Sequence, residues 1–316
     1  MQNLRCDVLL VGAGNIGFRH LQGLGKIHPL IQLWVVDPDT SALERAAAEW
    51  QLIGGVAGRF LRDIEQLPVT ASACVMATPA RGRLELVRRL LPCISGDTII
   101  IEKVAFTSIS EMHAAGLLLD AAGKQAYVNC PRRIWPLYTR LRALLAGKRL
   151  ALTVRGRDLG LGSNGVHFLD LLQYLSGETE LQVVEFSGGK VRPAKRAGYY
   201  ESYGRLRVIT PGGSSIELSA MEEDPEQITI NITSALGEMK VDEVRGIVTG
   251  EHGWIGERAP YQSELTGLVM QGLLDGRGCK LASFSTSRAA HAPLLDVLGR
   301  SFTAAGIDVS SGVPIT

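Results

Sequence analysis

The chain has 316 residues and a mass of 34.0 kDa, which at roughly 150 residues per domain predicts two domains and excludes a small disulfide-stapled fold. Lys and Arg number 33 against 32 Asp and Glu, so a net charge of +1 offers no basic surplus for binding nucleic acid. No apolar run approaches the roughly 18 residues of a membrane span. Glycine is over-represented, with 36 residues, which indicates tight turns or close backbone approaches.

The five cysteines argue against a disulfide framework and against a zinc site, because they are odd in number, far apart and include no C-x-x-C pair. We therefore expect no metal. The first residues, MQNLRCDVLL, lack the charged region, longer apolar region and cleavage site of a secretory signal. The sequence thus predicts a cytoplasmic protein with no membrane partner.

Short apolar runs alternate with helical patterns from residue 6 onward, as in βαβ units. The expected strands are 7–11, 32–36, 73–77, 98–102 and 125–129. The expected helices are 15–24, 41–50, 81–91 and 108–122. This pattern predicts an α/β fold, with a doubly wound parallel sheet of the Rossmann type over residues 1–125.

The rhythm changes after that boundary, where turn signals separate a series of alternating segments. The expected strands are 149–155, 181–187, 205–210, 215–220, 227–232, 237–241 and 246–249. The expected helices are 135–146, 166–175, 261–274 and 286–304. Residues 126–316 are therefore predicted to form an α+β domain, an open and mostly antiparallel sheet with helices on one face.

The strongest local motif is VLLVGAGNIGFRH at residues 8–20, a strand followed by a glycine-rich turn and a helix. Gly12 permits the tight turn, Gly14 lets the backbone approach a pyrophosphate, and Gly17 lets the helix pack on the strand. Asn15 and Ile16 begin the helix, whose amino end supplies amide donors to an anion. The alternative is a glycine-rich turn in an unrelated α/β protein.

Asp37 ends the next strand, 20 residues after Gly17. A carboxylate at this position can accept hydrogen bonds from both ribose hydroxyls and repels a 2′-phosphate. The sequence therefore predicts NAD rather than NADP as the cofactor.

Two further strand ends carry polar residues where an open parallel sheet lines its ligand crevice. Thr78 and Pro79 follow the third strand, and Glu102 and Lys103 follow the next. Thr78 could hydrogen-bond the cofactor, although Thr-Pro is also a common way to leave a strand. A lysine beside the nicotinamide can donate to the substrate hydroxyl or to the carbonyl that it becomes.

The glycine fingerprint ending in His20, the Ala-Thr-Pro strand exit and Glu102-Lys103, in this order, resemble the Gfo/Idh/MocA oxidoreductases, the glucose-fructose oxidoreductase and inositol dehydrogenase family. The resemblance covers essentially the whole chain. It implies a Rossmann domain that binds the dinucleotide through the glycine turn and through Glu102 and Lys103, followed by an open-sheet domain. The family motif is Glu-Lys-Pro, and Val104 stands here in place of the proline.

The resemblance extends to the segment that enters the second domain, where Asn129, Arg132 and Arg133 match a polar, arginine-rich stretch. It implies substrate binding by Asn129 and Arg132. Either arginine could meet a substrate carboxylate or phosphate with two hydrogen bonds. A salt bridge at the domain junction is at least as good an explanation for each arginine.

The last matching motif is a glycine-rich loop, Gly160 to Gly165, that leads to His167 at the position of the family's catalytic histidine. An imidazole has an ordinary pKa suited to taking a proton from a hydroxyl while hydride departs. The family's aspartate falls on Ser163, so Ser163 and Asn164 offer neutral hydrogen-bonding groups to a substrate. Asp170, three residues after His167, is a candidate to orient the imidazole or to replace the missing charge, and the alternative is a hydrogen bond at the domain interface.

These residues predict an NAD(H)-dependent oxidoreductase that acts on a hydroxyl or keto carbon of a sugar, polyol or activated sugar. The altered loop resembles branches associated with surface-polysaccharide sugar synthesis. Two alternatives are an epimerase or dehydratase that retains NAD, and a non-enzymatic dinucleotide or sugar sensor. The resemblance also implies a homodimer or homotetramer. The run Lys190, Arg192, Lys195 and Arg196 could attract an anionic sugar, or could simply be solvated.

Overall fold

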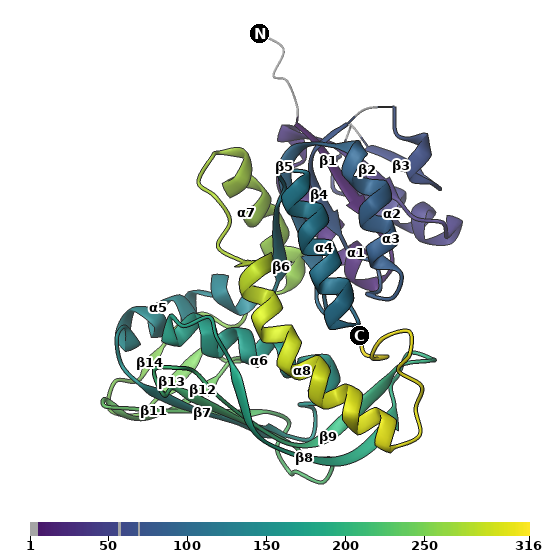
Figure 1. Cartoon of the computed structure of the whole chain (residues 1–316). Coiled ribbons are helices and arrows are strands. Elements are labelled where there is room, and N and C mark those ends of the chain that lie inside the picture. Colours follow the sequence, from purple (N-terminus) through teal and green to yellow (C-terminus); the bar gives the residue numbers. More distant parts are fainter. Residues whose placement is uncertain (1–5, 56–57, 69) are drawn as a thin grey trace. The chain divides into compact units, whose positions relative to one another are not determined.

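The computed structural model describes residues 6–55, 58–68 and 70–316 (Figure 1). The chain forms two compact units, each discontinuous in sequence. Unit 1 contains the described residues as far as Ala105, together with His113–Pro131 and Pro260–Phe284. Unit 2 contains Phe106–Met112, Arg132–Ala259 and Ser285–Thr316. The expected boundary between residues 125 and 126 divides the chain at one point, whereas each unit is assembled from three separate stretches of the sequence.

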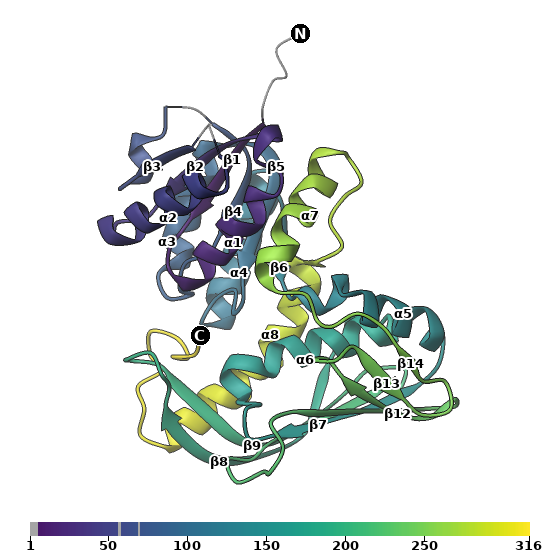
Figure 2. The ribbon, with the colours of Figure 1, turned by 180° about the vertical axis from the view of Figure 1, so that it is seen from behind.

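Unit 1 is built on a sheet which, in the described residues, has the strand order β15-β6-β5-β4-β1-β2-β3 and is parallel except for β15. Its strands are β1 (Cys6–Val11), β2 (Ile31–Val36), β3 (Gly58–Leu61), β4 (Ala71–Met76), β5 (Ile94–Glu102), β6 (Gln125–Asn129) and β15 (Ala282–Ser283). Its helices are α1 (Asn15–Gly25), α2 (Thr40–Leu52), α3 (Arg83–Leu90), most of α4 (Ile109–Ala121) and α7 (Gln262–Leu274). The central strands are apolar because helices cover both faces, α3 and α4 in front in Figure 1 and α1 and α2 in front in Figure 2. This is the predicted doubly wound sheet.

Helix α7 packs against α1 at van der Waals distance between backbones. A Cβ atom on Gly23 would lie 2.8 Å from Cβ of Thr266, and one on Gly267 would lie 2.3 Å from the carbonyl oxygen of Gly23. The pattern at 261–274 correctly predicts a helix. The expected place of this helix among residues 126–316 does not match its packing, which is on unit 1.

Unit 2 is built on a sheet which, in the part of the chain described, has the order β14-β13-β12-β11-β7-β10-β9-β8. Its strands are β7 (Leu150–Gly156), β8 (Gln182–Pro193), β9 (Tyr200–Ile209), β10 (Ser215–Ala220), β11 (Thr229–Ser234), β12 (Gly237–Asp242), β13 (Ile247–Thr249) and β14 (Trp254–Ile255). All neighbours pair antiparallel except β10 and β7, as predicted for a mostly antiparallel sheet. Helices α5 (Pro136–Leu145), α6 (Leu161–Ser176) and α8 (Phe284–Ala304) lie along one face (Figures 1 and 2). Buried and exposed residues alternate along β7, so the other face of this strand is exposed.

Short 3-10 helices occupy His28–Leu30, Ile64–Gln66, Leu91–Cys93 and Pro131–Ile134. Three details differ from the sequence-based expectation. Strand β3 was not expected, because four residues carry little periodic signal. Strand β8 continues to Pro193, beyond residue 187, where the expected strand ends. Helix α6 begins at Leu161 rather than at residue 166, so most of the expected glycine loop is helical.

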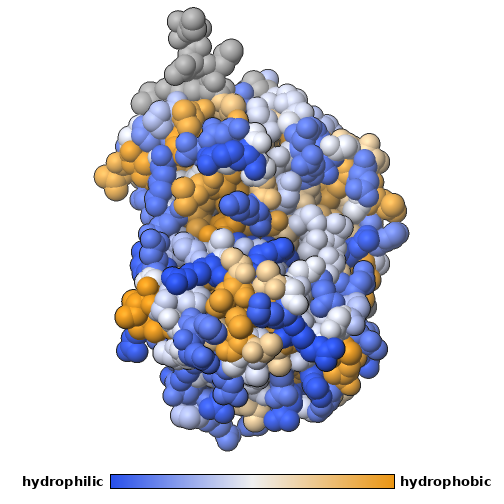
Figure 3. Space-filling view, turned by 90° about the vertical axis from the view of Figure 1, so that its left-hand side faces the viewer, coloured by the Kyte–Doolittle hydropathy of each residue, from blue (hydrophilic) through white to orange (hydrophobic). Residues whose placement is uncertain are grey.

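None of the helices in the described part of the chain is long and apolar enough to cross a membrane. On the face seen in Figure 3, apolar side chains lie in separate patches divided by hydrophilic ones. Well-separated apolar side chains of this kind are ordinary for a protein surface.

Candidate functional site

The glycine turn between β1 and α1 has the geometry that its sequence predicts. Gly12 has φ +96°, and a Cβ atom there would lie 2.9 Å from the carbonyl carbon of Ala77. A Cβ atom on Gly17 would lie 1.9 Å from the carbonyl oxygen of Gly12, so no larger residue fits either position. Gly14 has no atom near its missing Cβ, and it is exposed together with Asn15 and Ile16. The amino end of α1 is therefore open to a ligand.

Asp37 is fixed beside this turn. Its Oδ2 accepts a hydrogen bond of 2.6 Å from the amide of Ala13, and its Oδ1 accepts one of 2.8 Å from the amide of Asp39. A carboxylate has about four acceptor positions, so half-buried Asp37 keeps capacity for ribose hydroxyls. Arg45 of α2 reaches the same turn, with its Nη2 3.4 Å from the carbonyl oxygen of Ala13.

Thr78 and Pro79 lie at the carboxyl end of β4. The Oγ1 atom of Thr78 is buried and has no hydrogen-bond partner among the described residues. A buried hydroxyl without a partner costs about 1–3 kcal/mol, which a bound ligand would recover. The open glycine turn, the fixed Asp37 and this hydroxyl together fit a dinucleotide cofactor.

Arg83, at the start of α3, joins the ends of two strands. It is buried, and its Nη1 donates to the carbonyl oxygens of Glu102 at 2.7 Å, Val104 at 2.7 Å and Ala105 at 2.6 Å. Its Nη2 donates to the carbonyl oxygen of Thr78. The backbone around Lys103 is thus tied to the end of β4. In the sequence, Arg83 has nothing to distinguish it from a surface arginine.

Glu102 belongs to a closed ring of side-chain hydrogen bonds. His20 Nε2 lies 2.8 Å from Glu102 Oε1, and His20 Nδ1 lies 2.9 Å from Thr266 Oγ1. Asn129 Nδ2 donates to Glu102 Oε1 and, at 2.9 Å, to Gln262 Oε1, while Gln262 Nε2 donates to Thr266 at 3.0 Å. Two of these five residues, Gln262 and Thr266, come from α7, and no sequence pattern predicts that this helix lies here.

The ring controls the charge beside Lys103. Burial alone would raise the pKa of Glu102, but the His20 hydrogen bond and charge, the Asn129 hydrogen bond and the Lys103 charge outweigh it and lower this pKa below its ordinary value. Glu102 is therefore a carboxylate at neutral pH. Half-buried Lys103 follows it directly, and the Lys103–Val104 peptide bond is cis. Both Glu102 and Asn129, expected as ligand-binding residues, are engaged in this internal ring.

Arg132 and Arg133 pair with carboxylates inside unit 2. Arg132 Nε and Nη2 donate to Glu243 at 2.6 and 2.9 Å, and its guanidinium lies 4.3 Å from the ring centre of Phe168. Arg133 Nε donates to both oxygens of fully buried Asp170, at 2.9 and 2.8 Å. These pairings are of the kind that a structural role requires, and substrate binding by Arg132 stays a prediction.

Helix α6 carries the remaining expected residues. Ser163, Asn164 and His167 are half-buried, and His167 lies four residues after Ser163, on the same helix face. Asn164 Nδ2 donates to the carbonyl oxygen of Asp158 and to Ser163 Oγ, both at 3.2 Å.

The expected site residues thus fall into two groups. The cofactor residues, Lys103 and Asn129 are in unit 1, and Arg132, Ser163, Asn164 and His167 are in unit 2. In the basic run, Lys190 and Arg192 both pair with Glu222, at 3.6 and 3.3 Å on the surface.

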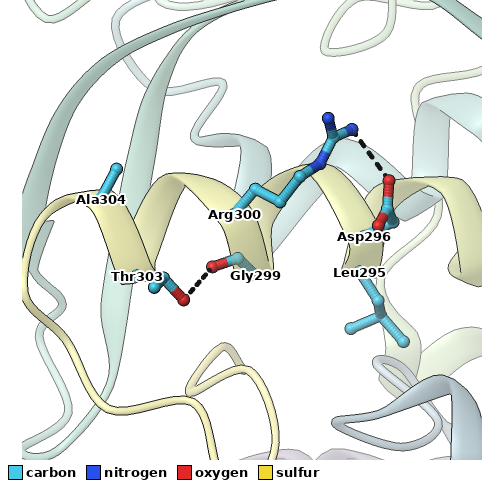
Figure 4. A pocket seen from close by; sticks show the side chains of 6 residues that line it. All are labelled: Leu295, Asp296, Gly299, Arg300, Thr303 and Ala304. Atoms are coloured by element: carbon cyan, nitrogen blue, oxygen red, sulfur yellow. Dashed lines mark hydrogen bonds and ion pairs between the residues drawn. The ribbon is translucent and has the colours of Figure 1, made fainter.

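A separate open hollow of about 530 Å³ lies on α8 (Figure 4). It is lined by Leu295, Asp296, Gly299, Arg300, Thr303 and Ala304. Arg300 is paired with Asp296 at 2.8 Å, and no residue expected in the site lines this hollow. Across residues 6–55, 58–68 and 70–316, no group of three or more His, Cys, Asp or Glu side chains is arranged to hold a metal ion.

No protein-family model matches the chain, and no curated protein matches it. Solved structures do. An oxidoreductase from Agrobacterium radiobacter, in complex with NAD+, L-tartaric acid and magnesium, is 15% identical with a TM-score of 0.73 over 95% of this chain and 97% of its own. The WlbA dehydrogenase from Bordetella pertussis, in complex with NADH and UDP-GlcNAcA, is 18% identical with a TM-score of 0.73 over 95% and 97%.

The UDP-N-acetylglucosamine 3-dehydrogenase GnnA from Acidithiobacillus ferrooxidans is 17% identical with a TM-score of 0.71, over 93% of this chain and 96% of its own. At such low identity these likenesses concern the fold. They show that the chain has, over nearly its whole length, the two-part α/β fold of these dehydrogenases.

Proposed function

We propose that this protein is an NAD(H)-dependent oxidoreductase that acts on a hydroxyl or keto carbon of a sugar, polyol or activated sugar. The observation that carries the proposal is the carboxylate of Asp37, held by the amide of Ala13 at an open glycine turn. This is the arrangement that binds an adenosine ribose in dinucleotide enzymes. The likeness in fold to dehydrogenases crystallised with NAD+ or NADH supports it.

The roles of the chain's own residues follow from their chemistry. Gly14, the amino end of α1 and Asp37 would hold the dinucleotide, which when bound accepts or donates a hydride. Lys103 would donate a hydrogen bond to the reacting oxygen and so stabilise its developing negative charge. His167 would accept the hydroxyl proton during oxidation and return it during reduction.

The cofactor is tested by calorimetric titration of the pure protein with NADH and NADPH. We expect NADH to bind at least tenfold more tightly, because the Asp37 carboxylate repels a 2′-phosphate. Failure of both to bind, or a preference for NADPH, would contradict the assignment.

Catalysis is tested by a screen of UDP-sugars, free sugars, polyols and sugar acids with NAD+, monitored by NADH absorbance. On an active substrate, we expect Lys103→Ala and His167→Ala each to lower kcat/KM by roughly 10²–10⁴-fold. Lys124→Ala and His252→Ala are matched controls in units 1 and 2 and should have full activity. Lys124 donates to the carbonyl oxygen of Gly96, and His252 is exposed. Equal activity in all five proteins would remove the proposed roles.

The same experiments distinguish the oxidoreductase from an epimerase or dehydratase that retains NAD and from a non-enzymatic sensor. Protein that carries NAD through gel filtration and turns substrate over without accumulating NADH would be an enzyme that retains its cofactor. Tight NADH binding without turnover on any substrate class would instead support a sensor.

A further inference from the structure

The amino end of α6 is held by a carboxylate from another element. Glu201 of β9 accepts hydrogen bonds from the amides of Gly162 and, at 3.0 Å, Ser163, while Ser202 also donates to it at 3.0 Å. These are two of the amides that the first turn of a helix leaves without partners. The residue before the helix, Gly160, has no side chain to cap them. The cap therefore comes from 38 residues later in the chain.

The glycines of this segment make room for that carboxylate. A Cβ atom on Gly160 would lie 2.5 Å from Cδ of Glu201, and one on Gly162 would lie 2.9 Å from Oε1. Gly165, in the next turn, lies against Leu294 of α8. The glycine-rich stretch before His167 is thus explained by packing on Glu201 and α8.

The carboxylate binds the helix backbone one turn before His167. Glu201 accepts from the amide of Ser163, and His167 follows four residues later, about 6 Å along the axis. The turn has no charge of its own, since Ser163 and Asn164 are neutral. A negative charge at a helix amino end offsets the positive end of the helix dipole, and it favours a protonated imidazole nearby.

Other ionisable groups lie on α6 and on the elements around it, among them Arg132, whose guanidinium lies over the ring of Phe168. Exposed Asp158 precedes α6, Tyr203 lies on β9, and the Arg133–Asp170 pair lies further along the helix. The charges of Arg192, on β8, and Glu222, after β10, influence the pKa of Tyr203 in opposite directions. From α8 and the chain end, the residues against the α6 glycines are apolar, Leu294 and Ile315. Glu201 is the carboxylate among these that is bonded to the α6 backbone before His167.

We propose that Glu201 is a positioning residue of the active site: it fixes the first turn of α6 and supplies the negative charge that keeps the His167 imidazole basic enough to accept the substrate proton. The inference rests on the proposed function, in which His167 transfers that proton. It assigns to β9 the carboxylate that the first turn of α6 lacks.

The test is an NMR titration of His167 in the whole protein. The six histidine signals are assigned with the His167→Gln spectrum. Glu201→Gln removes the charge and keeps one acceptor oxygen, enough for one of the two amides, so we expect the pKa of His167 to fall by about half a pH unit. Glu178→Gln is the matched control, because Glu178 accepts hydrogen bonds from Thr210 at 2.6 Å and Gly212 at 2.5 Å in a different loop. It should leave His167 unchanged.

Kinetics provide a second readout. During oxidation His167 must be unprotonated, so activity rises with pH through its pKa. In Glu201→Gln the acid limb of the pH profile of kcat/KM should therefore move to lower pH by the same half unit. The NMR titration needs no substrate: a shifted His167 in a protein without dehydrogenase activity would refute the function alone. An unshifted His167 in an active enzyme would refute the role of Glu201 alone.

A second pair of variants is available if Glu201→Gln fails to fold. Ser163→Asp and Ser163→Asn, each made with Glu201 retained, differ only in one charge at the same turn of α6. We expect the pKa of His167 to be about half a unit higher in the aspartate variant. Identical values in this pair would overturn the proposal.

Discussion

Asp37 and Arg45 both contact the backbone of Ala13 in the glycine turn, and under the proposed function their opposite charges favour different dinucleotides. The Asp37 carboxylate is bonded to the amide of Ala13, and the Arg45 guanidinium is near the carbonyl of the same residue. If the dinucleotide binds as proposed, removal of the carboxylate leaves the Arg45 cation beside the ribose, where it would attract a 2′-phosphate. The arginine therefore makes the dinucleotide preference depend on one acidic side chain.

We expect Asp37→Ser to weaken NADH binding at least tenfold and to strengthen NADPH binding. The measurement is calorimetric titration with both nucleotides. Asp39→Asn is the matched control, since asparagine caps α2 about as well as the aspartate that now accepts from Ser41 at 2.8 Å. Arg45→Ala in the Asp37→Ser background should remove the gain in NADPH affinity, and a gain that survives would contradict the role of Arg45.

Arg83 makes four bonds to main-chain oxygens at the ends of β4 and β5, so its loss should be felt in both stability and ligand binding. We expect Arg83→Met to lower the free energy of unfolding by about 2–4 kcal/mol, since buried carbonyls lose charged donors. The measurement is urea unfolding together with NADH titration. Arg88→Met, on the exposed side of the same helix, removes only a surface pair with Glu85 and should change stability by less than about 0.5 kcal/mol. Equal losses of unfolding free energy in Arg83→Met and Arg88→Met would show that the main-chain hydrogen bonds of Arg83 do not stabilise the fold.

At the scale of elements, the ring of His20, Glu102, Asn129, Gln262 and Thr266 joins α1, β5, β6 and α7. Because the pKa of Glu102 is lowered, its contribution to stability is complete above the ordinary glutamate range and is lost as the pH falls through the lowered value. We expect the wild type to lose more stability than Glu102→Gln between pH 6 and pH 3. Urea unfolding at stepped pH measures this, and parallel losses in the two proteins would contradict it.

The Arg133–Asp170 pair joins the segment before α5 to the middle of α6. Burial raises the pKa of Asp170, and the Arg133 guanidinium offsets part of that rise. Removal of the cation leaves a buried carboxylate alone, so we expect Arg133→Met to cost about 3–5 kcal/mol of unfolding free energy. The double variant Arg133→Met with Asp170→Leu should recover most of it in thermal and urea unfolding. A double variant as unstable as the single one would show that the loss comes from packing.

Sequence patterns predicted most elements of both sheets, because buried parallel strands and amphipathic helices have strong periods. They also placed Gly12, Gly17 and Asp37 at a strand–turn–helix unit and the next strand end, because this motif is contained in a short stretch of sequence. They did not predict the start of α6, because the glycines there suggested a loop and only Glu201 and Leu294, distant in sequence, favour a helix. Arg83 and Gln262 were missed for the same reason, since their bonds depend on tertiary structure alone.

At the scale of the whole molecule, unit 1 includes a helix from the last fifth of the sequence. Residues 260–284 supply α7, which buries Gly23 and closes the ring around Glu102. We expect a fragment of residues 1–131 not to fold cooperatively or bind NADH. The same fragment joined through a glycine-serine linker to residues 260–284 should do both. Circular dichroism melting and NADH titration test this, and an NADH-binding fragment without α7 would contradict it.

The exposed face of β7 bears on the proposed homodimer or homotetramer. Ala151, Thr153 and Arg155 are exposed there, as a pairing surface would require. We expect light scattering after gel filtration to give at least twice 34.0 kDa. Thr153→Glu introduces bulk and charge and should lower that mass. An unchanged mass would show that this face of β7 is not the interface.

The interleaved order of the two units also constrains how the protein is made. A ribosome releases the amino end first, but unit 1 lacks α7 and β15 until Phe284 has been synthesised. By then most of unit 2, from Arg132 to Ala259, has already been synthesised. The nascent amino-terminal sheet must therefore wait with the face of α1 exposed, and it is during this interval that the chain most needs protection from aggregation.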